Sequence, residues 1–380
     1  MYKKILALVL PITLLLSGCS KDNTDNSIDK ISSVRGTLLL NSIENIYPDG
    51  LITQSINGSN HIYFDFEKMD QTVLCSKPNC MHNNAECISK VVGECPIIYN
   101  DYIYYFVSVN GVKETKNGRE FYINSKLNRI SLETSEIEKV TEFTDCEPRT
   151  NYLIYNDKIY FCGHDLNPTE DEYGNILSGS SGGTTFICSI DLKTGEYKNY
   201  GSVYDGDKQY EGASSSSSGH ISGFYNSKIY MEYSFSKEKL DTIDLTKTDP
   251  RDVFTVMNFE FNPETETIKE SILPSGSYIW GNTYVYSNYP ENSSTVLYNG
   301  DKYTVDSVDS YISGKAFNYK LFLSGKWYDI KNGTEHIWND EYKYWRVITM
   351  YEDEYILANP ESTKFEKMNE EELLALDKEK

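Results

Sequence analysis

YNDYIYY at residues 99–105, YNDKIYF at 155–161 and YNSKIYM at 225–231 are three copies of one pattern. An aromatic residue precedes Asn and a second small polar residue, and a run rich in Ile and Tyr follows. Asn, Asp and Ser accept the backbone geometry of tight turns, whereas Ile and Tyr favour a half-buried strand. Each copy therefore predicts a turn that leads into a β-strand.

Further copies extend this pattern along the chain. They are WGNTYVY (280–286) and YEDEYIL (351–357), with looser versions in NGSNHIYF (57–64) and ISGKAFNY (312–319). Most copies are followed by a second motif, in which two alternating stretches flank a tight turn, as in a β-hairpin. Its copies are KLNRISLETSEIEK (126–139), FICSIDLKTGEYK (186–198), VMNFEFNPETETIK (256–269) and KWYDIKNGTEHIW (326–338).

A turn-strand unit followed by a hairpin, repeated along a chain, is typical of propeller blades. We therefore predict an all-β fold, a β-propeller of about seven blades over residues 34–365, with six or eight blades still open. A β-sandwich with accidental repeats is the alternative. Residues 163–184 and 201–219 are rich in Gly, Ser and acidic residues, and we expect them to be long surface loops.

The first eighteen residues, MYKKILALVLPITLLLSG, have the form of a signal peptide. Leu16-Ser17-Gly18-Cys19 resembles a bacterial lipobox, which implies that Cys19 carries the lipid, including palmitate-type acyl chains, and becomes the mature N-terminus. Two acyl chains suffice for stable anchoring. The alternative is an ordinary secretory signal with a chance cysteine. The lipobox thus predicts a lipid-anchored protein on the extracellular face of a bacterial cell membrane.

Residues 19–33 are polar and lack aromatic side chains, so we expect a flexible stalk. At the other end, residues 366–380 contain Asn369 before EEELLALDKEK (370–380), which predicts a capped short helical tail. Removing residues 1–18 takes away Lys3 and Lys4 and changes the formal charge from −21 to −23. Such a charge argues against nucleic acid as a partner.

The segment LCSKPNCMHNNAEC (74–87) holds Cys75, Cys80, His82 and Cys87. This Cys₃His set has the ligand types of a closed, structural zinc site, and we expect one structural zinc as the only cofactor. Disulfides that involve Cys87 and Cys95 are the alternative, since bridges persist outside the cell. Seven cysteines remain once Cys19 is lipidated, and an odd number cannot all pair. Reduced or redox-active thiols are a third interpretation.

Two other groups of residues are candidate sites. Cys162 and Cys188 fall on expected partner strands of one blade and are a candidate disulfide, with burial as apolar side chains the equal alternative. Cys146 is expected to be simply buried. Trp327, Trp338 and Trp345 lie close in sequence and could form an aromatic platform for a sugar or peptide ligand, whereas packing within the blades is the other interpretation.

The lipobox, the repeated IYY strands and the LCxKPxCxH segment together resemble a set of β-propeller lipoproteins of unknown function from Gram-positive anaerobes. The resemblance covers nearly the whole mature chain, and it supplies no activity that could be transferred. We therefore expect a surface-tethered recognition or scaffold module. Its ligand would be an extracellular glycan, peptide or protein, and no catalytic residue is nominated.

Two alternative functions remain open at the level of the sequence. One is an extracellular carbohydrate-active hydrolase or lyase, which needs two acidic groups, or an acid with His or Tyr, at one mouth of the propeller channel. The other is a metal-handling lipoprotein, which needs an exposed and exchangeable Cys/His cluster. Burial of that cluster would favour a structural role instead.

Overall fold

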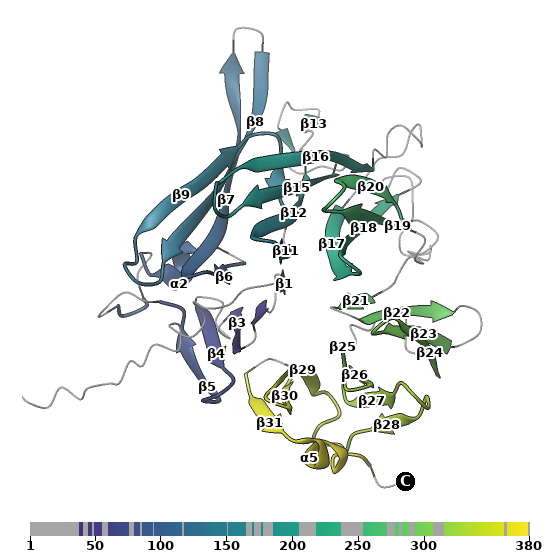
Figure 1. The fold of residues 1–380 in the computed structure, drawn as a ribbon. Helices are drawn as coiled ribbons and strands as arrows, with labels where there is room; N and C mark the ends of the chain where they lie inside the picture. The colour runs from purple at the N-terminus through teal and green to yellow at the C-terminus, as the bar shows by residue number, and fades with distance from the viewer. Residues whose placement is uncertain are drawn as a thin grey trace, which may run out of the picture.

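The computed structural model describes residues 38–40, 45–47, 49–54, 60–75, 80–83, 86–93, 95–115, 118–149, 151–164, 169–170, 176–177, 185–204, 218–236, 254–271, 278–280, 283–288, 293–306, 315–360 and 363–378. Seven blades form a β-propeller ring (Figure 1). The all-β fold class and the predicted seven blades are therefore confirmed. The signal peptide, Cys19 and the stalk lie outside the described residues.

The first two blades are four-stranded antiparallel sheets in chain order. The first blade comprises β2 (Asn45–Tyr47), β3 (Gly50–Gln54), β4 (His61–Asp65) and β5 (Asp70–Val73). The second comprises β6 (Ile97–Tyr99), β7 (Tyr102–Thr115), β8 (Gly118–Ser131) and β9 (Ile137–Phe143). Between them lies the helix α2 (Ile88–Val91).

The third blade has extra strands at its margins. It comprises β11 (Tyr152–Tyr155), β12 (Lys158–His164), β15 (Thr185–Asp191) and β16 (Tyr197–Tyr204). The short β10 (Glu147–Pro148) pairs with β12, and the N-terminal β1 (Leu38–Leu40) pairs with β11. The N-terminal strand thus pairs with the third blade, although the first blade follows it in sequence.

The remaining blades return to the simple order. The fourth comprises β17 (Ser218–Tyr225), β18 (Lys228–Ser236), β19 (Phe254–Asn262) and β20 (Thr267–Glu270). The fifth comprises β21 (Tyr278–Trp280), β22 (Thr283–Asn288), β23 (Ser293–Tyr298) and β24 (Asp301–Asp306). The sixth comprises β25 (Lys315–Phe317), β26 (Lys320–Leu323), β27 (Lys326–Asp329) and β28 (Glu335–Ile337). The seventh has three strands, β29 (Arg346–Tyr351), β30 (Glu354–Ala358) and β31 (Phe365–Met368).

The repeated Asn-containing turns join the first two strands of a blade. Asn100 and Asp101 have φ angles of 46° and 67°, and Asn156 and Asp157 have φ angles of 51° and 57°. Two consecutive residues with positive φ form a two-residue turn whose twist matches the flanking strands. The Tyr99–Tyr102 and Tyr155–Lys158 pairs close these turns, so the turn that the sequence predicts is the structural unit that repeats.

The two expected surface loops are shorter than their predicted ranges. Within residues 163–184, β13 (Thr169–Glu170) and β14 (Ile176–Leu177) form a two-stranded sheet of their own. Within residues 201–219, the first residues belong to β16 and the last to β17. Gly163 and His164 are the last residues of β12, and the other residues of these two ranges lie outside the described part of the chain.

The core of the protein lies between neighbouring blades. Leu51 and Phe64 of the first blade pack against Ile348 and Ile356 of the seventh, and all four are buried. Phe64 also stacks on Phe365, with ring centroids 4.1 Å apart. Apolar packing between the first and last blades therefore closes the ring.

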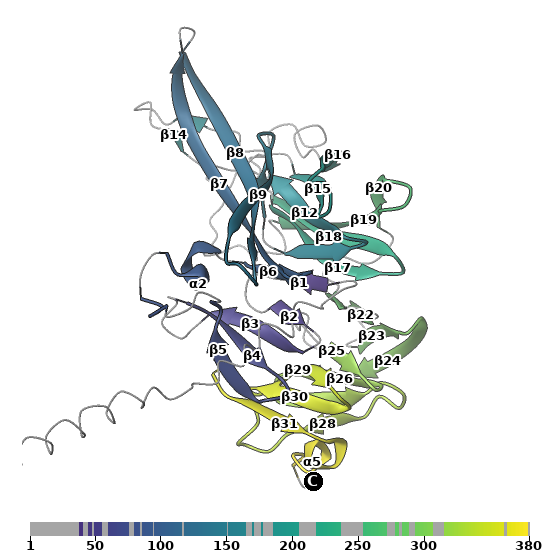
Figure 2. The same cartoon turned by 60° about the vertical axis from the view of Figure 1, so that its left-hand side comes forward.

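The C-terminal helix α5 (Glu370–Leu374) covers the lower edge of the last two blades (Figure 2). Asn369 caps it, because its side chain accepts a hydrogen bond from the Glu372 backbone while the Glu372 side chain accepts one from the Asn369 backbone. The seventh blade runs to Met368, so its last strand extends into the segment expected to be a tail.

Candidate metal centre

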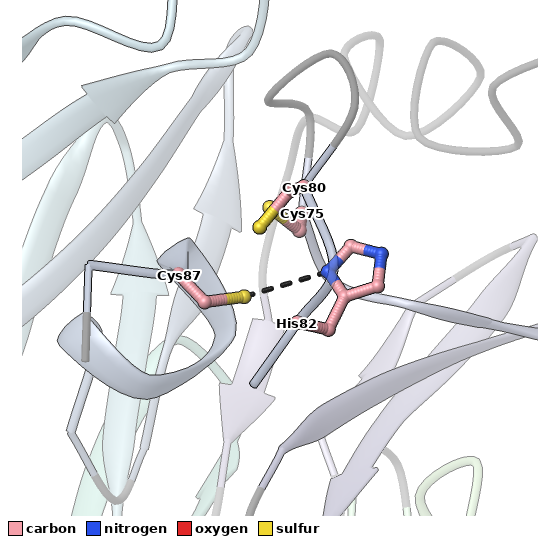
Figure 3. Close-up of side chains that lie close together, drawn as sticks. All are labelled: Cys75, Cys80, His82 and Cys87. Atoms are coloured by element: carbon pink, nitrogen blue, oxygen red, sulfur yellow. Dashed lines mark hydrogen bonds between the residues drawn. The ribbon is translucent and has the colours of Figure 1, made fainter. Parts of the chain in front are cut away.

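The connection between the first two blades brings together the four residues singled out in the sequence. Cys75 follows β5, and Cys87 directly precedes α2, whose Lys90 and Val91 amides donate to the Cys87 carbonyl oxygen at 2.9 and 3.1 Å. Cys80 and His82 lie between them (Figure 3). Residues 76–79 lie outside the described residues.

One ligand atom from each of Cys75, Cys80, His82 and Cys87 lies within 4.8 Å of all the others. The Cys87 Sγ to His82 Nδ1 distance is 3.5 Å, and the second ring nitrogen of His82 points away from the sulfurs (Figure 3). Tetrahedral zinc bonds of roughly 2.0 and 2.3 Å would place sulfur and nitrogen about 3.5 Å apart, and two sulfurs about 3.8 Å apart. The group could thus hold a metal ion after the widest-spaced ligands move inward by about 1 Å.

Burial differs among the four ligands. Cys87 is fully buried, whereas Cys75, Cys80 and His82 are partly buried. The exposed side chain next to them is Met81, which is 78% exposed. The group therefore lies near the surface of the connection, and only Cys87 reaches into the core.

Residues of the first blade hold the helix that carries Cys87. His61 at the start of β4 donates from Nδ1 to the Ser89 carbonyl oxygen at 2.9 Å. The Ser89 hydroxyl lies 3.0 Å from Cys87 Sγ and 2.9 Å from Asn60 Oδ1. Ser89 and Asn60 thus form a second layer around the sulfur that the sequence analysis did not identify, because Asn60 is far from the cluster in sequence.

The disulfide alternatives are not what the structure contains. Among the described residues, which include all seven cysteines after Cys19, no two sulfurs are bonded. Cys87 belongs to the Cys₃His group, whereas the Cys95 sulfur lies 3.7 Å from Asn45 Nδ2 in the core. Cys87 and Cys95 are therefore separate.

The candidate pair Cys162 and Cys188 is also not formed. Cys162 pairs with Ile187 and Phe161 pairs with Cys188 across β12 and β15. Because successive side chains on a strand point to opposite faces, this register places the two sulfurs on opposite faces of the sheet. They lie in different core clusters, and the buried Cys188 instead faces Cys146.

The tryptophans do not form an aromatic platform. Trp327, Trp338 and Trp345 are only 3%, 0% and 8% exposed, and they pack in one core cluster with residues of the last blade and the tail. Trp327 stacks on His336 with ring centroids 3.8 Å apart. These tryptophans therefore pack between the sixth and seventh blades, as the second interpretation of the sequence has it.

Comparison with known proteins finds only distant structural similarity. No protein-family model and no curated protein matches the chain. Among solved structures, YjhT is 11% identical over 87% of this chain and 97% of its own, with a TM-score of 0.38. An oligogalacturonate lyase in complex with manganese is 12% identical over 89% of this chain and 92% of its own, with a TM-score of 0.39. Dipeptidyl peptidase 4 of Porphyromonas gingivalis is 9% identical over 89% of this chain and 54% of its own, with a TM-score of 0.38. Likeness at this level transfers no activity to the chain.

Proposed function

We propose that this chain is a lipid-anchored recognition module, which Cys19 tethers to the outer face of a bacterial cell membrane and whose propeller binds an extracellular ligand. The lipobox around Cys19 supports the anchor. No helix in the described part of the chain is long and apolar enough to cross a membrane. The negative formal charge favours a ligand that is not a polyanion.

The observation that carries this proposal is the long hairpin of the second blade. β7 and β8 are each fourteen residues long and rise well beyond the rest of the ring (Figures 1 and 2). β6 pairs only with residues 102–104 of β7, and β9 pairs only with residues 125–130 of β8. The outer part of the hairpin thus extends past the blade that supports it.

Apolar side chains are exposed along one face of this hairpin. Val107, Val109 and Tyr122 are 37%, 52% and 45% exposed. Val107 and Val109 share a face because they are two residues apart on β7. Tyr122 pairs with Gly111 on the same face, and a Cβ added at Gly111 would lie 2.6 Å from the Tyr122 hydroxyl oxygen. The result is a tyrosine-centred contact surface on a projecting element, an arrangement suited to binding.

The test is a binding screen with soluble protein, residues 20–380, against extracellular polysaccharides, peptides and glycoproteins. A ligand found in this way should lose at least tenfold in affinity for a Val109→Ser, Tyr122→Ser variant. Ile337→Ser is the matched control, since Ile337 is 49% exposed on β28 of another blade. A ligand that binds both variants equally would contradict the role of the hairpin, and turnover of a polysaccharide would favour the hydrolase or lyase alternative.

The same proposal assigns zinc to Cys75, Cys80, His82 and Cys87. Three sulfurs and one imidazole nitrogen complete a tetrahedral shell and leave no open position, which suits a structural ion and not a catalytic one. When bound, the ion would polarise no substrate and would cross-link the connection between the first two blades. The burial of Cys87 supports this structural role over metal handling.

Chelation kinetics distinguish the two metal roles. A structural zinc should leave the native protein slowly in excess EDTA, and its loss should create new protease cleavage sites between residues 75 and 95. A cargo metal would exchange within seconds and leave the proteolysis pattern unchanged. The latter result would favour the metal-handling lipoprotein.

A further inference from the structure

A second group of thiols lies in the interior of the third blade. Cys146 follows β9, Cys188 is in the middle of β15, and both are fully buried. Their sulfurs are 3.8 Å apart. A disulfide needs an S–S distance of about 2.05 Å, so the sulfurs must approach by about 1.8 Å to form one.

Gly163 provides the space that the two sulfurs occupy. A Cβ at position 163 would lie 2.2 Å from Cys146 Sγ and 3.2 Å from Cys188 Sγ. Gly163 pairs with Phe186 on β15, two residues from Cys188, so both positions face the same side of the sheet. Any larger residue at this position would separate the two cysteines.

Tyr197 holds both thiols toward one another. Its hydroxyl oxygen lies 3.5 Å from Cys146 Sγ and 3.4 Å from Cys188 Sγ. The Tyr197 hydroxyl donates its hydrogen to the Asp145 carboxylate, at 2.8 Å from each oxygen. The tyrosine oxygen is therefore the acceptor for the two S–H groups, and loss of the thiol hydrogens would leave the Tyr197–Asp145 bond intact.

We propose that Cys146 and Cys188 form a disulfide in the mature protein, which ties the entry of the third blade to its third strand. The oxidant is a disulfide of low molecular weight, such as oxidised glutathione, or that of a thiol oxidoreductase. One cysteine thiolate attacks the oxidant and releases one thiol; the second thiolate then displaces the other thiol and closes the bond. Two electrons pass to the oxidant, and its two released sulfurs take up the two protons.

Burial governs when this exchange takes place. Burial raises the pKa of the Cys188 thiol well above its ordinary value, with the neighbouring Cys146 adding to the shift, so the folded protein holds little of the reactive thiolate. The bond therefore forms while the blade folds. For the same reason, the formed bond is inaccessible to reductants until the protein unfolds.

This pairing also accounts for the odd number of mature cysteines. Three belong to the Cys₃His group and two to the new pair. Cys95 packs beside Asn45, and Cys162 lies on the opposite face of the sheet, where burial raises its pKa to about 12. These two stay as thiols.

Peptide mapping of the wild-type chain tests the pairing. Protein of residues 20–380 is refolded with oxidised and reduced glutathione, denatured with N-ethylmaleimide, digested without reduction and analysed by mass spectrometry. The expected result is a Cys146 peptide joined to a Cys188 peptide, while Cys95 and Cys162 are alkylated. Alkylation of both Cys146 and Cys188, or linkage of Cys188 to Cys162, would overturn the proposal.

Substitutions give an independent readout. Cys146→Ser, Cys188→Ser and the double variant should each lower the Tm of the oxidised protein by a similar amount, on the order of 5 °C. Cys162→Ser should leave the cross-linked peptide in place. Dithiothreitol should leave the bond intact in native protein and cleave it in denaturant. Cleavage at equal rates in both conditions would contradict the buried location of the bond.

Discussion

At the scale of single residues, the backbone at His82 shows how the Cys₃His group is built. His82 has a φ angle of 56°, a left-handed conformation that residues other than glycine adopt infrequently. Glycine would accept this turn but supply no ligand. The conformation turns Nδ1 toward Cys87, and strain of this kind often accompanies a functional position.

Ser89 should tune the affinity of this centre for zinc. Its hydroxyl donates to Asn60 Oδ1 and its oxygen lies 3.0 Å from Cys87 Sγ, and the loss of such a hydrogen-bonding neighbour typically changes metal affinity by about 10- to 100-fold. We expect Ser89→Ala to raise the Kd for zinc by that factor in competition with a chelating dye. Ser324→Ala, whose hydroxyl contacts only the Tyr344 carbonyl at 3.1 Å, is the control. Equal zinc affinity in both variants would contradict the assigned role of Ser89.

For single residues, the sequence predicted the members of the Cys₃His group but not the residues that surround them. Cys75, Cys80, His82 and Cys87 converge because they lie within one short segment, so chain connectivity alone places them close together. Asn60 contacts Ser89, whereas Gly163 and Tyr197 lie against the sulfurs of Cys146 and Cys188, and only the folded arrangement of the blades brings these residues together. The same register separates Cys162 from Cys188, which the sequence pattern paired.

At the scale of elements, an acidic residue links three strands of the fourth blade. Glu260 of β19 is 6% exposed and contacts Lys228 of β18 at 2.9 Å and Lys269 of β20 at 2.7 Å. Burial raises the pKa of Glu260, but the hydrogen bonds and charges of the two lysines outweigh it, so the pKa lies below its ordinary value. The ionised carboxylate therefore stabilises the folded blade.

These contacts predict that Glu260→Gln lowers the free energy of unfolding by an amount that depends on pH. A pKa that folding lowers contributes stability above the unfolded value near 4.5, and the contribution is lost as the pH falls through the folded value. We expect the variant to be about 1 kcal/mol less stable than the wild type at pH 7, and nearly equal to it once the pH lies below the lowered pKa of Glu260 in the folded protein, in urea unfolding. Glu266 forms an exposed ion pair with Lys198. Glu266→Gln should therefore lower the free energy of unfolding by less than Glu260→Gln does at pH 7. The prediction would be contradicted if Glu260→Gln lowered the free energy of unfolding by the same amount at both pH values.

The C-terminal helix belongs to the core of the last two blades. Leu373 is fully buried in the cluster with Trp338, whereas its neighbour Leu374 is 40% exposed. Leu373→Ala should lower the free energy of unfolding by about 2–4 kcal/mol because it leaves a cavity. Leu374→Ala should cost less than about 1 kcal/mol. Equal losses in urea titrations of the two variants would show that the helix does not pack as described.

Local patterns explain why these elements could be predicted and their partners could not. The Asn-Asp turns and the capping box at Asn369 depend on neighbours in sequence, so the residues themselves determine them. The pairing of β1 with β11 joins residues 38–40 to residues 152–154, and no sequence pattern records that choice. Burial of Trp327, Trp338 and Trp345 likewise depends on the tail.

In the whole molecule, different interactions stabilise different interfaces between the blades of the ring. The first and seventh blades meet through apolar packing. The third blade receives the N-terminal strand, and the proposed zinc and disulfide lie on either side of the second blade. The fixed ring would present the β7–β8 hairpin to the surroundings of the cell.

Membrane attachment should depend on Cys19 alone. Cys19→Ala removes the thiol that carries the lipid, and the lipobox predicts that the protein is then released into the medium or remains unprocessed. Fractionation of cells and medium, together with labelling by a fatty acid analogue, measures both outcomes. Continued acyl labelling of the variant would contradict this assignment.

We infer that a metal ion held by Cys75, Cys80, His82 and Cys87 orders the connection between the first two blades. Metal analysis of protein purified without chelators is the decisive measurement. We predict about one zinc per chain in the wild type and in Met81→Ala, and a loss of zinc in Cys80→Ser. A metal-free wild type in which the cluster thiols resist alkylation until they are reduced would contradict the claim.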